Sequence, residues 1–121
     1  MQNESTAYVT GATGWLGSRL MVSLGAQHSI QRKASRFTKI KCFVQADSDL
    51  GSIDLPFSDY EVVRGDIRNP DDVDRFLKGA NGGTVFHCAG LIHPALRTRD
   101  LFTINACGAQ NLADAAAASG V

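Results

Sequence analysis

Apolar and polar positions follow one another along the chain in a way that predicts strands and helices in turn. Residues 7–10 are a short β-prone run that stops at a glycine cluster, which is typical of a buried strand. After Gly14 the period changes, and leucines at positions 16, 20 and 24 predict a helix that ends near Gly25. Three later β-prone runs are further candidate strands: 40–44, 60–63 and 84–86.

Two more helices are predicted in the second half of the chain. Asn69 is a suitable N-cap, Pro70 fits the first helical position, and Gly79 ends this helix. The last helix is long and ends at Gly120, since one apolar face is followed by a run of alanines at 115–118. The shared face is Leu101, Ile104, Gly108 and Leu112. The order β-α-β-loop-β-α-β-α predicts one α/β domain, residues 1–121, with a doubly wound parallel sheet.

The composition is that of an average globular domain. The 121 residues carry 12 basic and 12 acidic side chains and are 44% hydrophobic. Without net positive charge we expect no nucleic-acid partner. Without a long apolar run or a signal-peptide pattern we expect a cytoplasmic protein with no membrane segment. The spacing of the cysteines argues against disulfides and zinc and favours buried thiols at Cys42, Cys88 and Cys107.

The candidate chemistry lies where the first predicted strand meets the first predicted helix, at residues 10–17 (TGATGWLG). Backbone N–H groups and the helix dipole favour an anion at such a junction, so a pyrophosphate is a suitable ligand. Gly11 permits a tight turn, Gly14 lets a ligand approach bare backbone, and Gly17 lets the helix pack closely on the sheet. No Gly-Lys-Ser/Thr follows, which excludes a P-loop.

A segment without acidic residues follows this helix. Residues 27–46 are longer than a compact β-α-β connection needs, so we expect an extended exposed loop there. A solvated surface loop is the simpler interpretation, and the alternative is a basic side chain that reaches a cofactor phosphate. The basic residues are Arg32, Lys33, Arg36, Lys39 and Lys41.

Four ordered motifs resemble a known family. The string TGATGWLGSRL resembles the opening of the extended short-chain dehydrogenase/reductase family: NAD-dependent epimerases, dehydratases and 3β-hydroxysteroid dehydrogenase-like reductases. Three further segments match in order: GDIRNP at 65–70, VFHCAG at 85–90 and INACGAQNL at 104–112. The resemblance covers about residues 6–121. It implies a Rossmann-like sheet, truncated to about the first four strands, and NAD or NADP as cofactor.

The resemblance also implies which residues contact the cofactor. The glycine turn would hold the pyrophosphate, Asp66 would contact the adenine, and the small residues 88–90 would line the nicotinamide ribose. Asn105, unfavourable inside a helix, is expected to hydrogen-bond neighbouring backbone. The expected cofactor-binding residues are Gly11, Thr13, Gly14, Trp15, Leu16, Gly17, Gln45, Asp66, Ile67, Cys88, Ala89, Gly90 and Asn105.

Several of these residues have alternative roles. Asp66 suits a cap or turn as well as a cofactor contact, whereas a nucleophilic Cys88 has no base at a recognisable spacing. His87 and His93 lack further metal ligands. The choice between NAD and NADP stays open. The position at the end of the second strand is Gln45, which is neither the acid that favours NAD nor the arginine that favours NADP, and Asp47 lies two residues on.

No catalytic residue is assigned within the chain. The family's Tyr-x-x-x-Lys pair follows a fifth strand, and neither Tyr8 nor Tyr60 has a lysine four residues on. We therefore expect the NAD(P)-binding part of an epimerase, dehydratase or reductase that transfers hydride at a hydroxyl or carbonyl carbon of a small-molecule substrate. The stretch FHCAGLI resembles the 3β-hydroxysteroid dehydrogenase-like or reductase branch of the family slightly more than the sugar-nucleotide branch.

Two other functional hypotheses remain. A non-catalytic dinucleotide-binding or redox-sensing module would need no catalytic tyrosine. A structural α/β domain without a ligand would leave the three glycines of the turn unexplained. In each case the fourth strand would be an open edge, from which we expect a homo-oligomer.

Overall fold

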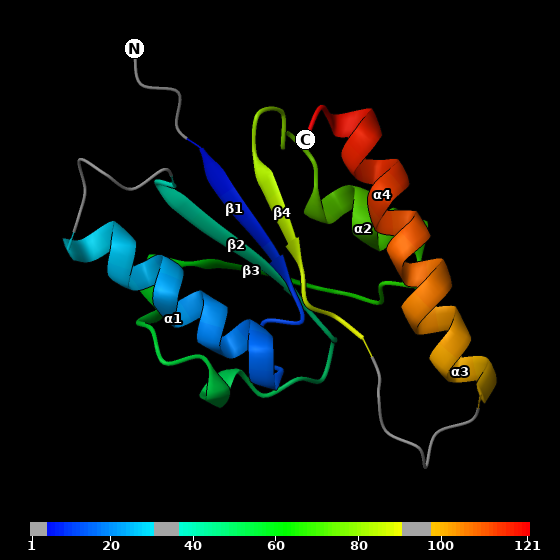
Figure 1. The fold of residues 1–121 in the computed structure, drawn as a ribbon, viewed down its shortest axis with the longest axis horizontal. Helices are drawn as coiled ribbons and strands as arrows, with labels where there is room; N and C mark the ends of the chain where they lie inside the picture. Colours follow the sequence, from blue (N-terminus) through cyan, green and yellow to red (C-terminus); the bar gives the residue numbers. More distant parts are fainter. Residues whose placement is uncertain (1–4, 31–36, 91–97) are drawn as a thin grey trace.

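The computed structural model describes residues 5–30, 37–90 and 98–121 and shows a four-stranded parallel sheet (Figure 1). The strand order is β3-β2-β1-β4, and every pairing is parallel. The strands are β1 (Thr6–Thr10), β2 (Lys39–Val44), β3 (Glu61–Arg64) and β4 (Thr84–His87). The α/β fold class is therefore confirmed, and each predicted strand is present within a residue or so of its expected limits.

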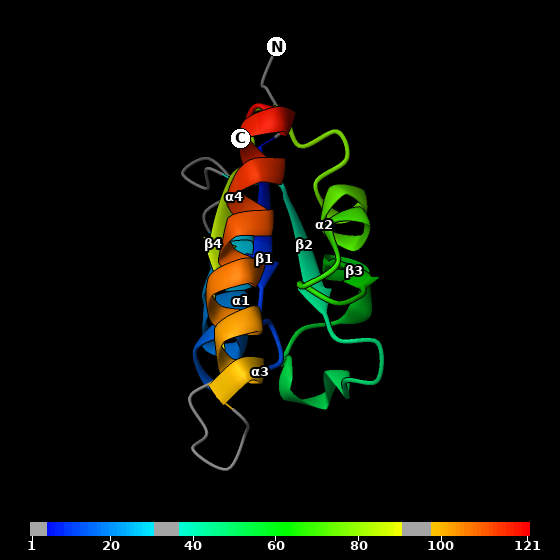
Figure 2. The same ribbon diagram turned by 90° about the vertical axis from the view of Figure 1, so that its right-hand side faces the viewer.

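Helices cover both faces of the sheet. Helix α1 (Trp15–Ile30) lies on one face, and α2 (Pro70–Phe76) and α4 (Gly108–Ser119) lie on the other. Figure 2 views the molecule from the side of α4, with α4 in front of the sheet and α1 behind it. The short helix α3 (Thr98–Phe102) leads into α4 through a π-helical segment, Thr103–Cys107. None of the described helices combines the length and apolar character that crossing a bilayer requires.

Alternate strand residues supply two separate cores because neighbouring side chains of a strand point to opposite faces. Val9 of β1 packs with Met21 of α1 in the first core, and both are fully buried. Tyr8, the neighbour of Val9, belongs to the second core under α2 and α4. There the ring of Phe76 meets Tyr8 edge-on at 5.5 Å and Phe43 at 5.2 Å between centroids. The two cores together fix the sheet between its helix layers.

The first helix is longer than predicted. It continues through Gly25 to Ile30, so the prediction that it ends near Gly25 is wrong. Gly25 is buried, and a Cβ at that position would lie 2.5 Å from Leu55 Cδ2. The glycine therefore allows the segment between β2 and β3 to approach the helix, which is a packing role that looks like a stop signal in the sequence.

The expected extended loop at 27–46 is also wrong in its limits. Residues 27–30 belong to α1, and Lys39 and Lys41 lie in β2. Arg32, Lys33 and Arg36 lie outside the described residues, so their predicted roles stay predictions.

The predicted helix ends are mostly correct. The Asn69 side chain accepts a hydrogen bond from the Asp71 N–H at 3.0 Å, which confirms the N-cap. Helix α2 ends at Phe76 rather than at Gly79, which instead adopts φ +75° in the turn that follows. Gly120 is the left-handed cap of α4, with φ +77°. The one long helix expected at the end is in fact α3 and α4 with the π-helical segment between them.

The cysteines differ in exposure. Cys42 is buried and Cys88 is partly buried, but Cys107 is exposed on the π-helical segment. The prediction of three buried thiols is therefore wrong for Cys107, because only part of the surface of this segment packs against the sheet.

Candidate functional site

A cavity of about 570 Å³ lies at the carboxyl ends of the strands. This is the edge of an open parallel sheet at which ligands bind, and the size is ordinary for a ligand pocket. Its walls come from the turn after β1, the loop after β2, the loop after β3 and the residues after β4. The lining residues are Gly11, Thr13, Gly14, Phe43, Val44, Gln45, Ala46, Asp47, Ser48, Gly65, Asp66, Ile67, Arg68, Asp72, Cys88, Ala89, Gly90 and Ile104.

The glycine turn is shaped by two close backbone approaches. Gly11 has φ +66°, and a Cβ there would lie 2.6 Å from Ala89 N, so only glycine lets the turn pass the end of β4. A Cβ on Gly17 would overlap the Gly11 carbonyl oxygen. Gly17 thus lets α1 pack on the turn, which corrects the expectation that it packs on the sheet. Gly14 is exposed and lines the cavity, and its N–H donates to Gly11 O at 3.0 Å.

Thr10 fastens the end of β4 to the glycine turn. Its fully buried hydroxyl oxygen accepts hydrogen bonds from the N–H groups of Cys88 and Ala89, each at 3.1 Å. The same oxygen lies 2.7 Å from His87 Nδ1. Because both lone pairs are used, the hydroxyl proton is donated to Nδ1, and the imidazole carries its own proton on Nε2. Burial also lowers the pKa of His87, which agrees with a neutral ring.

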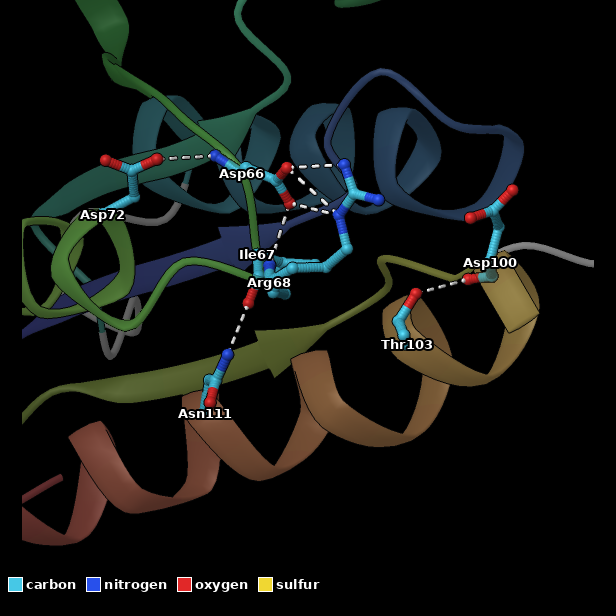
Figure 3. Close-up of polar contacts among 7 residues, drawn as sticks. All are labelled: Asp66, Ile67, Arg68, Asp72, Asp100, Thr103 and Asn111. Atoms are coloured by element: carbon cyan, nitrogen blue, oxygen red, sulfur yellow. Dashed lines mark hydrogen bonds and ion pairs between the residues drawn. The ribbon is translucent and has the colours of Figure 1, made fainter.

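Asp66 lies at the start of the loop after β3 and forms an ion pair with Arg68 (Figure 3). Arg68 Nη2 donates to Oδ2 at 2.7 Å, and Nε contacts both carboxylate oxygens. These hydrogen bonds, the nearby positive charge and the Arg68 N–H lower the pKa of Asp66, with burial acting in the opposite direction. The Asp66 N–H donates in turn to Asp72 Oδ2 at 2.9 Å, so helix α2 holds this loop from the other side.

Helix α4 also holds this loop, through contacts with Ile67. Asn111 Nδ2 donates to the Ile67 carbonyl oxygen at 3.1 Å (Figure 3). A Cβ on Gly108 would lie 2.8 Å from Ile67 Cγ2, so glycine is needed for the helix to approach Ile67. The sequence places Gly108 and Asn111 in a family motif without a role for either. In the structure these two residues determine how closely α4 approaches Ile67, and so they position the loop that carries Asp66.

The loop after β2 is held by Arg64. Its Nη1 donates to the carbonyl oxygens of Gln45, Ala46 and Ser48 at 3.3, 3.2 and 2.9 Å. Gln45 and Asp47 are exposed and line the cavity. Arg64 itself was not expected at the site, and nothing in the sequence pattern marks a strand-ending arginine as a clamp for the neighbouring loop.

Most of the expected cofactor contacts lie around this one cavity. They are Gly11, Thr13, Gly14, Gln45, Asp66, Ile67, Cys88, Ala89 and Gly90. Gly17 lies behind the turn, and the side chains of Trp15 and Leu16 are 85% and 60% exposed at the start of α1. Asn105 is outside the lining, although its Oδ1 would lie 3.3 Å from a Cβ on Gly90. Its proximity to Gly90 is compatible with the expected contact to neighbouring backbone.

The alternative chemistries find little support among the described residues. Burial raises the pKa of the Cys88 thiol, which is opposite to what a nucleophile needs. No group of His, Cys, Asp and Glu side chains in the part of the chain that the structure describes has the arrangement of a metal site. His93 lies outside those residues.

The family model "NAD dependent epimerase/dehydratase family" matches residues 7–121. The chain belongs to this family. The predicted resemblance is thereby confirmed, and so, at the level of the family, is the prediction of a nicotinamide dinucleotide cofactor.

Two curated relatives match nearly the whole chain. A ceramide reductase of Caulobacter vibrioides is 36% identical over 113 residues, which are 93% of this chain and 31% of the relative. The protein y4nL of Sinorhizobium fredii is 32% identical over 120 residues, which are 98% of this chain and 33% of the relative. The chain thus spans about a third of the length of the curated relatives it matches.

Solved structures share the fold. UDP-glucose 4-epimerase of Thermus thermophilus, in complex with NAD, superposes with a TM-score of 0.75 at 22% identity, covering 96% of this chain and 35% of that one. Uronate dehydrogenase of Agrobacterium tumefaciens superposes with a TM-score of 0.64 at 25% identity, covering 95% of this chain and 37% of that one. Bordetella bronchiseptica WbmG, in complex with NAD, superposes with a TM-score of 0.73 at 19% identity, covering 98% of this chain and 36% of that one.

Proposed function

We propose that this chain forms the NAD-binding part of an oxidoreductase-type enzyme. The observation that carries the proposal is the cavity into which the glycine turn, the loops after β2 and β3 and the end of β4 all open. Family membership supports the same function, since the family is described as NAD dependent.

The residues present fit the pyrophosphate of a dinucleotide. Gly14 offers exposed backbone at the cavity wall. The first N–H groups of α1 have no acceptor within the helix, and the dipole of the helix favours negative charge at this end. A phosphate group seated beside Gly14 would satisfy those N–H groups. A Cβ at this position would lie 3.3 Å from the Gly11 carbonyl oxygen, so a larger side chain would crowd the turn at the cavity wall.

The acidic side chains of the cavity favour NAD over NADP. Asp47 lines it beside Gln45, just after β2, where dinucleotide-binding folds contact the adenosine ribose. Among the described residues of the lining the only basic side chain, Arg68, is paired with Asp66. An added 2′-phosphate would thus meet the Asp47 carboxylate with no unpaired cation among those residues to balance it.

When bound, the nicotinamide ring accepts or donates a hydride. We propose that this chain binds and orients the cofactor, with the small residues Cys88, Ala89 and Gly90 giving the nicotinamide ribose room to lie against the end of β4. The tyrosines Tyr8 and Tyr60 are buried and neither is followed by a suitably spaced lysine. We therefore assign the proton exchange with the substrate to neither tyrosine.

The substrate proposal is a small molecule whose hydroxyl or carbonyl carbon exchanges the hydride. The similarity to a ceramide reductase supports the reductase branch over the sugar-nucleotide branch. A non-catalytic dinucleotide-binding module would use the same cavity. Turnover of NADH by the complete protein with carbonyl substrates would distinguish the two, because a binding module would bind NADH without consuming it.

Calorimetric titration of the chain with NAD, NADH, NADP and NADPH tests the proposal directly. We expect saturable binding of NAD and NADH that is at least about tenfold tighter than that of the phosphorylated forms. Gly14→Val should abolish binding, because its side chain fills the approach to the backbone. The matched control is Ala113→Val on the exposed surface of α4, which adds similar bulk far from the cavity and should bind normally. Equal NAD affinity of Gly14→Val and the parent would contradict the proposed pyrophosphate site.

A further inference from the structure

His87 belongs to a hydrogen-bond network that joins the ends of β1 and β4 beside the cavity. Thr10 and His87 are register partners of the two parallel strands, so their side chains meet on one face of the sheet. Thr10 Oγ1 lies 2.7 Å from His87 Nδ1 and also accepts from the N–H groups of Cys88 and Ala89. Cys88 and Ala89 line the cavity and His87 does not, so the imidazole acts on the cavity through Thr10.

This network requires a neutral imidazole. A hydroxyl group has two lone pairs and one proton, and the Cys88 and Ala89 N–H groups use the lone pairs of Thr10. Protonation of His87 would put a proton on Nδ1 as well as on Nε2, so two donors would face each other at 2.7 Å. The ring must then turn away from Thr10 or take a lone pair from one of the two N–H groups. In either case the network loses a hydrogen bond.

The imidazole is placed where it can exchange protons with solvent. His87 is exposed at the end of β4, and β4 forms an edge of the sheet (Figure 1). Burial of part of the ring lowers its pKa, so the folded chain favours the neutral form more than the unfolded chain does. The protonation of His87 and the integrity of the network are therefore coupled.

The charged and titratable groups around His87 do not replace this coupling. On β1 the titratable neighbour of Thr10 on the same face is Tyr8, and on β4 the next residue is Cys88; burial raises the pKa of both, so both stay neutral near pH 7. Charged side chains on the helices of this face are absent from the causes that lower the pKa of His87, among the residues that the structure describes. These side chains are Arg99 and Asp100 on α3, Asp114 on α4, and three aspartates and Arg75 on α2.

We propose that neutral His87 is a positioning residue for dinucleotide binding, because it accepts the Thr10 hydroxyl proton and so keeps the backbone of Cys88 and Ala89 in place at the cavity. Protonation of His87 disrupts this arrangement, and NAD binding weakens as the solution becomes more acidic. The inference rests on the proposed function and adds a pH dependence to it. The loss of one hydrogen bond corresponds to a decrease of about 3- to 10-fold in affinity.

The test is calorimetric titration of the full chain with NAD at about pH 8 and about pH 5, values on either side of the ordinary histidine pKa and above that of carboxylates. We expect the affinity of the parent to fall about 3- to 10-fold between them. His87→Asn is the decisive variant, because its side-chain oxygen takes the place of Nδ1 and accepts the Thr10 proton but does not titrate. It should bind as the parent does at pH 8 and keep that affinity at pH 5.

Two further variants serve as controls. His87→Gln carries its oxygen further out, near the position of Nε2, and should bind NAD more weakly than His87→Asn at both pH values. His28→Asn removes another imidazole, from the last turn of α1, and should reproduce the pH dependence of the parent. Thermal melting of each variant at each pH establishes that it is folded at the temperature of titration.

Proton NMR gives a second measurement on the imidazole itself. The Cε1–H resonance that is missing in His87→Asn identifies His87 in the parent. The pKa of His87 should fall when NAD is added, because tighter binding to the neutral ring and a lower pKa in the complex are the same coupling. A purely structural His87 would give no change in pKa on addition of NAD.

Two results would overturn the inference: equal affinity of the parent at the two pH values, or a decrease at pH 5 that His87→Asn retains in full. If the parent does not bind NAD even at pH 8, where the imidazole is neutral, the proposed function itself fails and the inference fails with it. That outcome is distinguishable because it appears before the pH or the sequence is changed.

Discussion

Replacing the hydroxyl of Thr10 tests whether this one side chain holds Cys88 and Ala89, which line the cavity, against the end of β1. Thr10→Val keeps the shape of the side chain and removes only its hydrogen bonds. The Ala89 N–H, bonded to the hydroxyl at 3.1 Å, would be left without that acceptor, whereas the Cys88 N–H keeps its second contact, to the Thr10 carbonyl at 3.2 Å. His87 Nδ1 would lose its donor.

The expected loss follows from these bonds. A buried N–H left without a partner costs about 1–3 kcal/mol, and each lost hydrogen bond with a remaining alternative costs about 0.5–1.5 kcal/mol. Thr10→Val should therefore destabilise the fold by about 2–4 kcal/mol. The control, Thr10→Ser, keeps the hydroxyl and loses one buried methyl group, for about 1 kcal/mol. In a chain of this length the difference between the variants should be roughly 5–10 °C in Tm.

Urea unfolding of the parent and both variants measures these free energies, and calorimetry with NAD measures the site. Thr10→Val should also bind NAD more weakly than Thr10→Ser, because Ala89 and Gly90 line the cavity and would no longer be fixed to β1. Equal stability of the two variants would refute the role assigned to the hydroxyl, since they differ in its presence and in one methyl group.

Three other predictions concern packing, pH and assembly. Gly17→Ala should destabilise the fold by about 3 kcal/mol or more, because its Cβ meets fixed backbone; Gly25→Ala, in the same helix, should stay within about 1 kcal/mol, because its Cβ meets only the movable end of Leu55 and the helix gains from alanine. Stability should fall as pH decreases below about 4, because the lowered pKa of Asp66 gives folding free energy that is present above the unfolded pKa and lost on protonation; Asp66→Asn should flatten this part of a urea-unfolding pH profile, and an unchanged slope would contradict it. Light scattering should show association of the chain, and a monodisperse monomer would contradict the expected homo-oligomer.

Local patterns predicted the elements well because each has a local cause. The run at 7–10 forms β1, whose alternate side chains are buried in the two cores. The Asn69 side chain caps α2 by accepting a hydrogen bond from the N–H two positions further on. Gly25 was misinterpreted because its reason for being glycine is Leu55, thirty residues away along the chain and adjacent only in the fold. A glycine in a sequence does not distinguish a stop from a close approach.

The candidate site was predictable in position and not in its internal bonds. The glycine turn and Asp66 are marked by motifs, and the ends of parallel strands meet at one edge of the sheet. The clamps are not marked. Arg64 acts on a loop of the neighbouring strand, and Thr10 acts on residues 78 and 79 positions away, so neither has a spacing that a single sequence reveals.

Hydrogen bonds from two helices determine the position of the loop that carries Asp66. Helix α2 holds the Asp66 N–H through Asp72, and α4 holds the Ile67 carbonyl through Asn111, so consecutive residues are fixed from opposite sides. These bonds fix the backbone of the two residues, and the Asp66 carboxylate turns only about its own side-chain bonds. Arg68 is attached to the carboxylate from the open side, where only solvent-exposed bonds must change. Movement of the Asp66–Arg68 pair at the cavity surface is therefore confined to the two side chains, while the backbone that carries Asp66 stays where α2 and α4 hold it.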